Sequence, residues 1–348
     1  MTMAEFQKIY YMEWTHRLWG RIVGISFLVP AVYFIASRKV TKPMALRIAG
    51  IGGLISFQGV LGWWMVKSGL KDDLFAPGSH PRVSQYRLVA HLGTAFLCYT
   101  AMLWNGLQIL REKRLLSNLD AAETILVRLR HPKLHVFRTS IGALACLVFI
   151  TAMSGGFVAG LDAGLIYNDF PWMGNSLTPP STELFSDFYS KKADGRDLWW
   201  RNAFENPSLA QLDHRILATS TFSAIVALFA YSRYAPRVRK LIPFGSRKAM
   251  HGVLGFACLQ VALGITTLLY LVPLPLASAH QAGSLALLSY VIILGSRTWL
   301  PNPRFSALLA RRVMMMKPTL VRKALKAPPD VRQHSNLFKA FPGIQGFS

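Results

Sequence analysis

Long apolar runs, each able to cross a lipid bilayer as a helix, constrain this chain of 348 residues more than any other feature. A hydrocarbon layer of about 30 Å takes about 20 apolar residues in helical form. The chain is 52% hydrophobic and still carries a formal net charge of +23, a combination that soluble domains rarely show. We therefore predict an all-α, polytopic membrane helical bundle. Its seven transmembrane helices are expected near residues 9–36, 44–67, 87–110, 139–160, 211–232, 249–272 and 274–296.

Positive charge gathers on one side of the predicted bundle. If successive helices alternate in direction, that side receives residues 37–47, 111–138, 233–248 and 297–348, which hold more than two thirds of the 39 Lys and Arg. This is the positive-inside asymmetry, and it predicts the orientation. The basic tail is expected to meet anionic lipid headgroups. No RNA- or DNA-binding motif accompanies it, so nucleic acid is not an expected partner. Basic residues of the tail include Arg311, Arg312, Lys317, Arg322, Lys323 and Lys326.

Three pairs of similar segments recur in the same order along the chain. They are "EWTHRLWG" (13–20) with "QLDHRILA" (211–218), "QGVLG" (58–62) with "QVALG" (260–264), and "VAHLGTA" (89–95) with "ASAHQAG" (277–283). Constant order predicts two tandem, pseudo-symmetric halves whose repeats run parallel.

The second half carries an element that the first half lacks, because a helix near 139–160 and a long loop precede its repeat. We expect an intact molecule of eight helices in two four-helix halves, with the first helix missing here through truncation or a late start codon. The predicted divisions are an N-terminal half-bundle (1–115), a basic linker (116–138), a C-terminal half-bundle (139–300) that includes an outside loop (161–210), and a basic tail (301–348).

Four of the nine histidines lie near the same end of their predicted helices, two in each half. One intramembrane histidine often only bonds a neighbour, but two imidazoles that face each other across a bundle can hold a cofactor. The four candidate ligands are His16, His91, His214 and His280. The other five are expected to be surface or interfacial residues: His80, His131, His135, His251 and His334.

Haem suits these histidines better than a bare metal ion does. Zinc sites usually cluster more ligands, and copper sites usually recruit Cys or Met. The three cysteines, Cys98, Cys146 and Cys258, are spread over apolar helices and are expected to be packing residues. A haem takes an axial ligand on each side of its plane and needs backbone close to the ring. Glycines that could give this clearance, or merely pack helices, are Gly20, Gly24, Gly93, Gly255, Gly264 and Gly283.

Charged residues beside the histidines suggest different roles for the two halves. Arg17 and Arg215 each follow a candidate ligand and are expected to pair with haem propionates, although snorkelling to the headgroups is the alternative. Glu13 lies one helical turn before His16, on the same face, where a carboxyl group could transfer protons. Gln211 holds the equivalent place in the second half and cannot ionise. The first half is therefore predicted to perform chemistry and the second half to hold a cofactor.

Over most of residues 5–290 the chain resembles the heme A synthase family, specifically its mitochondrial branch. The stretches that carry this resemblance are "EFQKIYYMEWTHRLWGRIVG", "FQGVLGWWMVKSGL", "PRVSQYRLVAHLGTA", "MSGGFVAGLDAGLIYNDFPWMG", "ENPSLAQLDHRILA" and "LGITTLLYLVPLPLASAHQAGSLALL". The resemblance implies an oxidoreductase that converts a methyl substituent of heme O into the formyl group of heme A for cytochrome c oxidase, by two successive oxidations.

The resemblance also implies roles for particular residues. The haem b ligands fall on His214 and His280, the histidines of the substrate haem site fall on His16 and His91, and the catalytic glutamate falls on Glu13. Implied partners are a heme O synthase that supplies the substrate, a ferredoxin-type electron donor and cytochrome c oxidase assembly factors. The implied location is the mitochondrial inner membrane, with the basic loops and tail in the matrix and the His-bearing ends towards the intermembrane space. The resemblance does not decide whether the chain forms a homo-oligomer.

Two other functions fit the same residues. A di-haem b-type electron-transfer cytochrome needs the four histidines but no ionisable Glu13. A non-enzymatic haem carrier or oxidase-assembly scaffold would use the outside loop as a docking surface. A transporter is less favoured, because the inverted repeats usual in transporters are absent.

Overall fold

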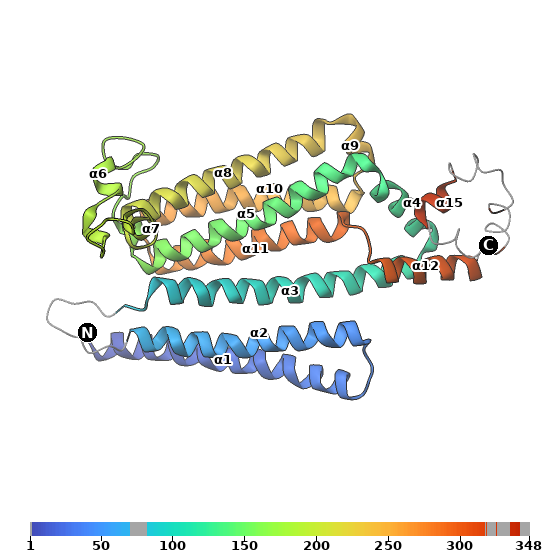
Figure 1. Ribbon diagram of the computed structural model, residues 1–348, viewed down its shortest axis with the longest axis horizontal. Coiled ribbons are helices and arrows are strands. Elements are labelled where there is room, and N and C mark those ends of the chain that lie inside the picture. Colours follow the sequence, from blue (N-terminus) through green and yellow to red (C-terminus); the bar gives the residue numbers. More distant parts are fainter. Residues whose placement is uncertain (1, 70–81, 317, 319–324, 326–334, 342–348) are drawn as a thin grey trace. The chain divides into compact units, whose positions relative to one another are not determined.

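The described part of the chain folds into helices joined by turns. The computed structural model describes residues 2–69, 82–316, 318, 325 and 335–341, and within them β structure is limited to one isolated bridge, Met173–Ser176 (Figure 1). The helices that form the two halves are α1 (Met3–Ala36), α2 (Lys42–Ser68), α3 (Gln85–Ser117), α5 (His135–Gly160), α8 (Pro207–Tyr234), α10 (Phe244–Leu269) and α11 (Leu274–Thr298). The prediction of an all-α polytopic membrane bundle is confirmed.

The number of membrane spans differs from the prediction. Six of the described helices are long and apolar enough to cross a membrane, and α3 is the predicted span that is not among them. Its apolar stretch is interrupted by polar side chains such as those of His91, Asn105 and Gln108, which lower its hydropathy. The expected count of seven is therefore not confirmed.

Two compact units divide the described chain. The first comprises Met1–Met102 with Ala159–Leu161, so it holds α1, α2 and the first part of α3. Within it α1 packs against α2. A capping box starts α1, because the Thr2 hydroxyl accepts from the Glu5 amide while the Glu5 carboxylate accepts from the Thr2 amide.

The second unit comprises Leu103–Val158 and Asp162–Ser348. Within it α5, α8, α10 and α11 run side by side, and α10 packs against both α8 and α11 (Figure 1). Helix α8 begins four residues earlier than the periodicity predicts, because Asn206 accepts from the Ser208 amide and Pro207 occupies the first helical position.

Short elements fill the predicted outside loop of residues 161–210. They are the 3₁₀ turns η3 (Ala163–Leu165) and η4 (Asp187–Tyr189) and the helices α6 (Ser181–Leu184) and α7 (Leu198–Glu205). The loop is therefore an ordered cap rather than an extended connection.

Part of the predicted basic tail folds onto the predicted linker. Helices α4 (Leu119–Arg130), α12 (Pro303–Met316) and α15 (Asn336–Ala340) share a hydrophobic cluster with the end of α3. Its fully or nearly buried members include Leu115, Leu126, Phe305, Leu309, Val313 and Phe338. Arg311 and Arg312 lie on the exposed side of α12, so contact of this helix with anionic lipid stays a prediction. The other predicted tail residues and two histidines lie outside the described residues: Lys317, Arg322, Lys323, Lys326, His80 and His334.

Replacing Leu309 by Ala is expected to loosen this tail cluster. Leu309 is fully buried, and loss of a buried leucine side chain typically costs about 2–5 kcal/mol. Amide hydrogen exchange in α12 and α4 should accelerate accordingly. The matched control is Leu308→Ala, since the neighbouring leucine is 53% exposed. Equal exchange in the two variants would contradict the assigned packing.

Candidate cofactor sites

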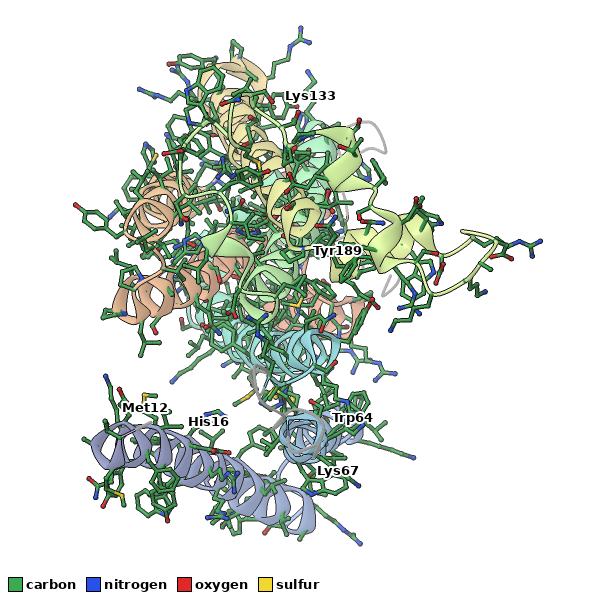
Figure 2. All side chains as sticks on the ribbon, turned by 90° about the vertical axis from the view of Figure 1, so that its left-hand side faces the viewer. Met12, His16, Trp64, Lys67, Lys133 and Tyr189 are labelled. Atoms are coloured by element: carbon green, nitrogen blue, oxygen red, sulfur yellow. The ribbon has the colours of Figure 1, made fainter. Side chains whose placement is uncertain are left out.

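In the first unit the structure brings His16 of α1 and His91 of α3 together. Their ring centroids lie 6.4 Å apart, and the ring planes are nearly perpendicular at 85°. Figure 2 shows His16 and Met12 on the same face of α1, and both residues line a shallow, open hollow with Tyr11, Thr15 and Trp19.

In the second unit His214 of α8 and His280 of α11 form a pair with the same geometry. Their ring centroids also lie 6.4 Å apart, with an interplanar angle of 89°. The four histidines selected from the sequence thus meet as two pairs of equal spacing. Within the part of the chain that the structure describes, no three His, Cys, Asp or Glu side chains gather as a metal cluster.

The spacing of each pair suits two axial ligands of one iron. An imidazole nitrogen lies about 2 Å from a bound metal, and the ring centre lies about 1 Å behind that nitrogen. Two imidazoles on opposite sides of one haem iron therefore have ring centres about 6 Å apart. Both measured distances agree with this value, so the residues present fit a bis-histidine haem in each unit.

A glycine on a neighbouring helix lies against three of the four histidines. A Cβ atom built on Gly62, Gly155 or Gly264 would come within 3.3, 3.0 or 3.1 Å of the Cε1 atom of His91, His214 or His280, respectively. These contacts are tighter than a real Cβ normally makes. Each ring can therefore lie in its place because the neighbouring residue is a glycine without a side chain. Gly264 was among the expected glycines, whereas Gly62 and Gly155 were missed. The signal for Gly62 was present, since it matches Gly264 in the repeated "QGVLG" and "QVALG".

Four of the other expected glycines do not lie against the histidines in this way. Within 4 Å of a built Cβ, Gly20 and Gly255 meet nothing, Gly24 meets Ile55, and Gly283 meets Gln260 and Leu263. Their predicted role as clearance for a porphyrin stays a prediction.

Ser154 of α5 holds the ring of His214 and was missed by the sequence reasoning. Its Oγ atom lies 2.8 Å from the Nδ1 atom of His214. The Nδ1 atoms of His91 and His280 are buried and have no hydrogen-bond partner among the described residues. Nothing in the sequence alone distinguishes Ser154 from other helical serines, because its partner is 60 residues away.

Glu13 and Arg17 form an ion pair along α1. The Arg17 guanidinium donates to the Glu13 carboxylate one turn away, and both side chains are about half exposed. Arg17 therefore already has a carboxylate partner, and its predicted contact with a haem propionate stays a prediction. Glu13 lies three residues before His16 on α1, as expected, and its catalytic role stays a prediction.

Arg215 anchors the outside loop. Its guanidinium donates to the backbone carbonyl groups of Tyr167, Asp169, Pro171 and Trp172 at distances between 2.9 and 3.1 Å. Gln211 adds a bond from its Nε2 atom to the Tyr167 carbonyl, at 2.9 Å. In the described structure the Arg215 guanidinium donates to these carbonyl groups, whereas the sequence predicted that it would donate to a haem propionate. The propionate contact itself is not tested and stays a prediction.

Two carboxylates, the half-buried Glu183 and the buried Asp197, hold the rest of the loop together. Glu183 accepts from the hydroxyl groups of Tyr167 and Ser208, the first at 2.6 Å. Burial and the neighbouring Glu183 raise the pKa of Tyr167 to about 12. Asp197 accepts from the Ser190 hydroxyl and the Arg201 guanidinium, at 2.7 and 2.6 Å. The Ser190 hydroxyl, together with further hydrogen bonds, lowers the pKa of Asp197 well below its usual range.

Replacing Arg215 by Gln is expected to release the loop segment at residues 167–172. Hydrogen bonds to a charged donor contribute about 1.5–3 kcal/mol each when well formed, and losing several of them should speed protease cleavage of this segment at least about tenfold. Limited proteolysis of the purified chain measures the rate. Arg196→Gln is the control, because Arg196 is largely exposed and, among the described residues, pairs with nearby Asp194. Equal cleavage rates would exclude the proposed anchoring.

The loop around Asp197 is expected to open in acid. A carboxyl group whose pKa is depressed by folding stabilises the folded state above its unfolded pKa, and this contribution is lost as pH falls through the folded value. Cleavage of residues 186–201 by pepsin should therefore be slow at about pH 4 and rise steeply towards about pH 2. Asp197→Asn should already be cleaved quickly at the higher pH. A pH profile shared by the variant and the wild type would refute this account.

Comparison with known proteins shows similarity along most of the chain. The family model described as cytochrome oxidase assembly protein matches residues 1–292. The chain is 47% identical over 303 residues to heme A synthase COX15 of Saccharomyces cerevisiae, covering 87% of this chain and 61% of that protein. It is 41% identical over 287 residues to heme A synthase of Nitrosospira multiformis, covering 82% of this chain and 71% of that protein.

A third relative is a fusion. The chain is 44% identical over 301 residues to the heme A synthase-mitochondrial ferredoxin fusion protein of Schizosaccharomyces pombe, covering 85% of this chain and 48% of that protein. The chain thus spans less than two thirds of the length of both fungal relatives.

Proposed function

The chain belongs to the cytochrome oxidase assembly protein family, and from this premise we propose that it is a heme A synthase. The proposed reaction oxidises one methyl substituent of heme O to the formyl group of heme A, in two successive two-electron oxidations of the same carbon. The observation that carries the proposal is the pair of bis-histidine sites, each with its ring centroids 6.4 Å apart. The relatives named heme A synthase, at 41–47% identity, support it.

We assign the pair in the second unit to a resident haem b. His214 and His280 would hold its iron, and a haem bound there would supply a one-electron redox centre. The ordered loop supports this assignment, because Arg215 and Gln211 tie it to the helix that carries His214.

We assign the pair in the first unit to the substrate, with His16 and His91 holding the iron of heme O. Glu13 is the proposed catalytic residue, since its carboxyl group lies one helical turn before His16 on the same helix and the second half has Gln211 in its place. Arg17 donates to the Glu13 carboxylate and thereby orients the group that is proposed to exchange protons with the substrate.

The fused relative suggests the electron source. Its name joins a heme A synthase to a mitochondrial ferredoxin, which supports a ferredoxin-type donor for this chain. We further propose the mitochondrial inner membrane as its location, with the basic segments on the matrix side. Heme O synthase and oxidase assembly factors complete the proposed set of partners.

Replacing Glu13 by Gln is expected to lower heme A formation by at least about 100-fold, because general acid–base groups contribute about 10²–10⁴-fold to rates. The measurement is chromatography of haems extracted from cells that make heme O and lack another heme A synthase. The control is Glu5→Gln on the same helix, where an amide side chain can still accept the capping-box hydrogen bond. Both variants should keep the haem absorbance of the second pair.

A di-haem electron-transfer cytochrome is the second candidate. The equal geometry of the two pairs favours it, since neither pair by itself distinguishes a substrate haem from a resident one. Wild-type amounts of heme A from Glu13→Gln would remove the catalytic role of Glu13 and favour this reading. Haem b as the sole extracted pigment would favour it as well.

A further inference from the structure

A hydrogen bond between two helices decides which nitrogen of His214 is free. The Ser154 Oγ atom on α5 lies 2.8 Å from the His214 Nδ1 atom on α8. The same hydroxyl group donates to the backbone carbonyl of Thr151, at 2.8 Å. A serine hydroxyl has a single hydrogen, so with that hydrogen on the Thr151 carbonyl the oxygen acts as acceptor towards His214.

The consequence concerns the tautomer of the imidazole. When Nδ1 donates to Ser154, Nδ1 carries the hydrogen of the neutral ring. The Nε2 atom then keeps its lone pair, which is the form that binds a metal. The ring orientation is fixed at the same time, because the hydrogen bond lies in the plane of the imidazole.

The surrounding contacts keep Ser154 in place. Gly155, the next residue, lets the α5 backbone approach the ring, since a Cβ built there would lie 3.0 Å from the His214 Cε1 atom. Two turns along α8, the Thr221 hydroxyl lies 2.7 Å from the Thr151 hydroxyl. Helices α5 and α8 are thus joined by two side-chain hydrogen bonds, Thr151 with Thr221 and Ser154 with His214. The first bond keeps the two helices close where the second one forms.

His280, the other histidine of the pair, has a backbone contact with Gln260 but no such side-chain partner among the described residues. The His280 Nδ1 atom is buried without a hydrogen-bond partner among the described residues. His214 is therefore the ligand of its pair whose tautomer is set by a side chain of the protein.

We propose that Ser154 is a positioning residue that holds His214 with its hydrogen on Nδ1 and its Nε2 atom free for haem iron. The role in haem binding rests on the proposed function, whereas the effect on the tautomer does not. Hydrogen bonds from a ligating imidazole to a neighbouring acceptor raise its basicity and fix its orientation. Ser154 thereby stabilises the ferric state and retains the haem.

The first test needs no haem. The chain is purified haem-free with ¹⁵N-labelled histidine, and His214→Gln identifies the His214 signals. The wild type should show a protonated Nδ1 and an unprotonated Nε2. Ser154→Ala should shift the population towards the other tautomer, and Ser154→Thr, which restores a hydroxyl group, should reverse that shift. Ser284→Ala is the matched control, because the Ser284 hydroxyl bonds only the Gln281 carbonyl of its own helix, one turn after His280.

The second test measures the haem-loaded chain. Ser154→Ala should raise the midpoint potential of the second haem and speed its dissociation at least about tenfold, while Ser284→Ala should change neither. An unchanged tautomer, or an unchanged potential and dissociation rate, in Ser154→Ala would overturn the inference. A wild-type chain that shows the expected tautomer but takes up no haem would support the effect of Ser154 on the ring and overturn the proposed function instead.

Discussion

Close contact between a histidine ring and a glycine on the neighbouring helix is the interaction on which both sites depend. In lipid, apolar surfaces gain little by meeting each other, so small residues and polar contacts set how helices pack. Gly62, Gly155 and Gly264 let a backbone approach the rings of His91, His214 and His280. Both pairs have the same centroid distance, which suits an iron between two axial ligands.

Guanidinium groups inside the apolar stretches find their partners within the protein. Desolvation of a charge is expensive, so a buried or half-buried arginine requires strong acceptors. Arg17 meets the Glu13 carboxylate, and Arg215 meets four carbonyl groups of the loop that precedes α8. Arg215 thereby couples the order of the loop to the helix that carries His214.

The two halves repeat a common plan but differ where the chemistry is proposed. Glu13 is replaced by Gln211, which bonds the loop instead of ionising. The second pair has one ring with a side-chain partner, since Ser154 bonds His214, whereas the Nδ1 atoms of His280 and of His91 have no such partner among the described residues. A site that holds a resident cofactor benefits from a fixed ligand, whereas a site that admits and releases a substrate benefits from a ligand with fewer constraints. The differences between the halves therefore agree with the proposed division into a cofactor half and a substrate half.

Hydropathy and the internal repeat by themselves predicted the helical membrane bundle and singled out four histidines, because these depend on residue type and spacing along one helix, whereas the family followed from the resemblance of longer stretches. The tertiary structure decided which groups form hydrogen bonds with His214 and Arg215. The contact of Ser154 with His214 joins residues 60 positions apart, and the carbonyl groups that hold Arg215 lie more than 40 positions before it. Every residue has a backbone carbonyl, so the sequence does not indicate which carbonyl groups accept a hydrogen bond. The residue type of a helical serine likewise does not show which neighbour its hydroxyl group contacts. Only the packing of α5, α8 and the loop selects these acceptors, since hydrogen bonding depends on distance and direction in space.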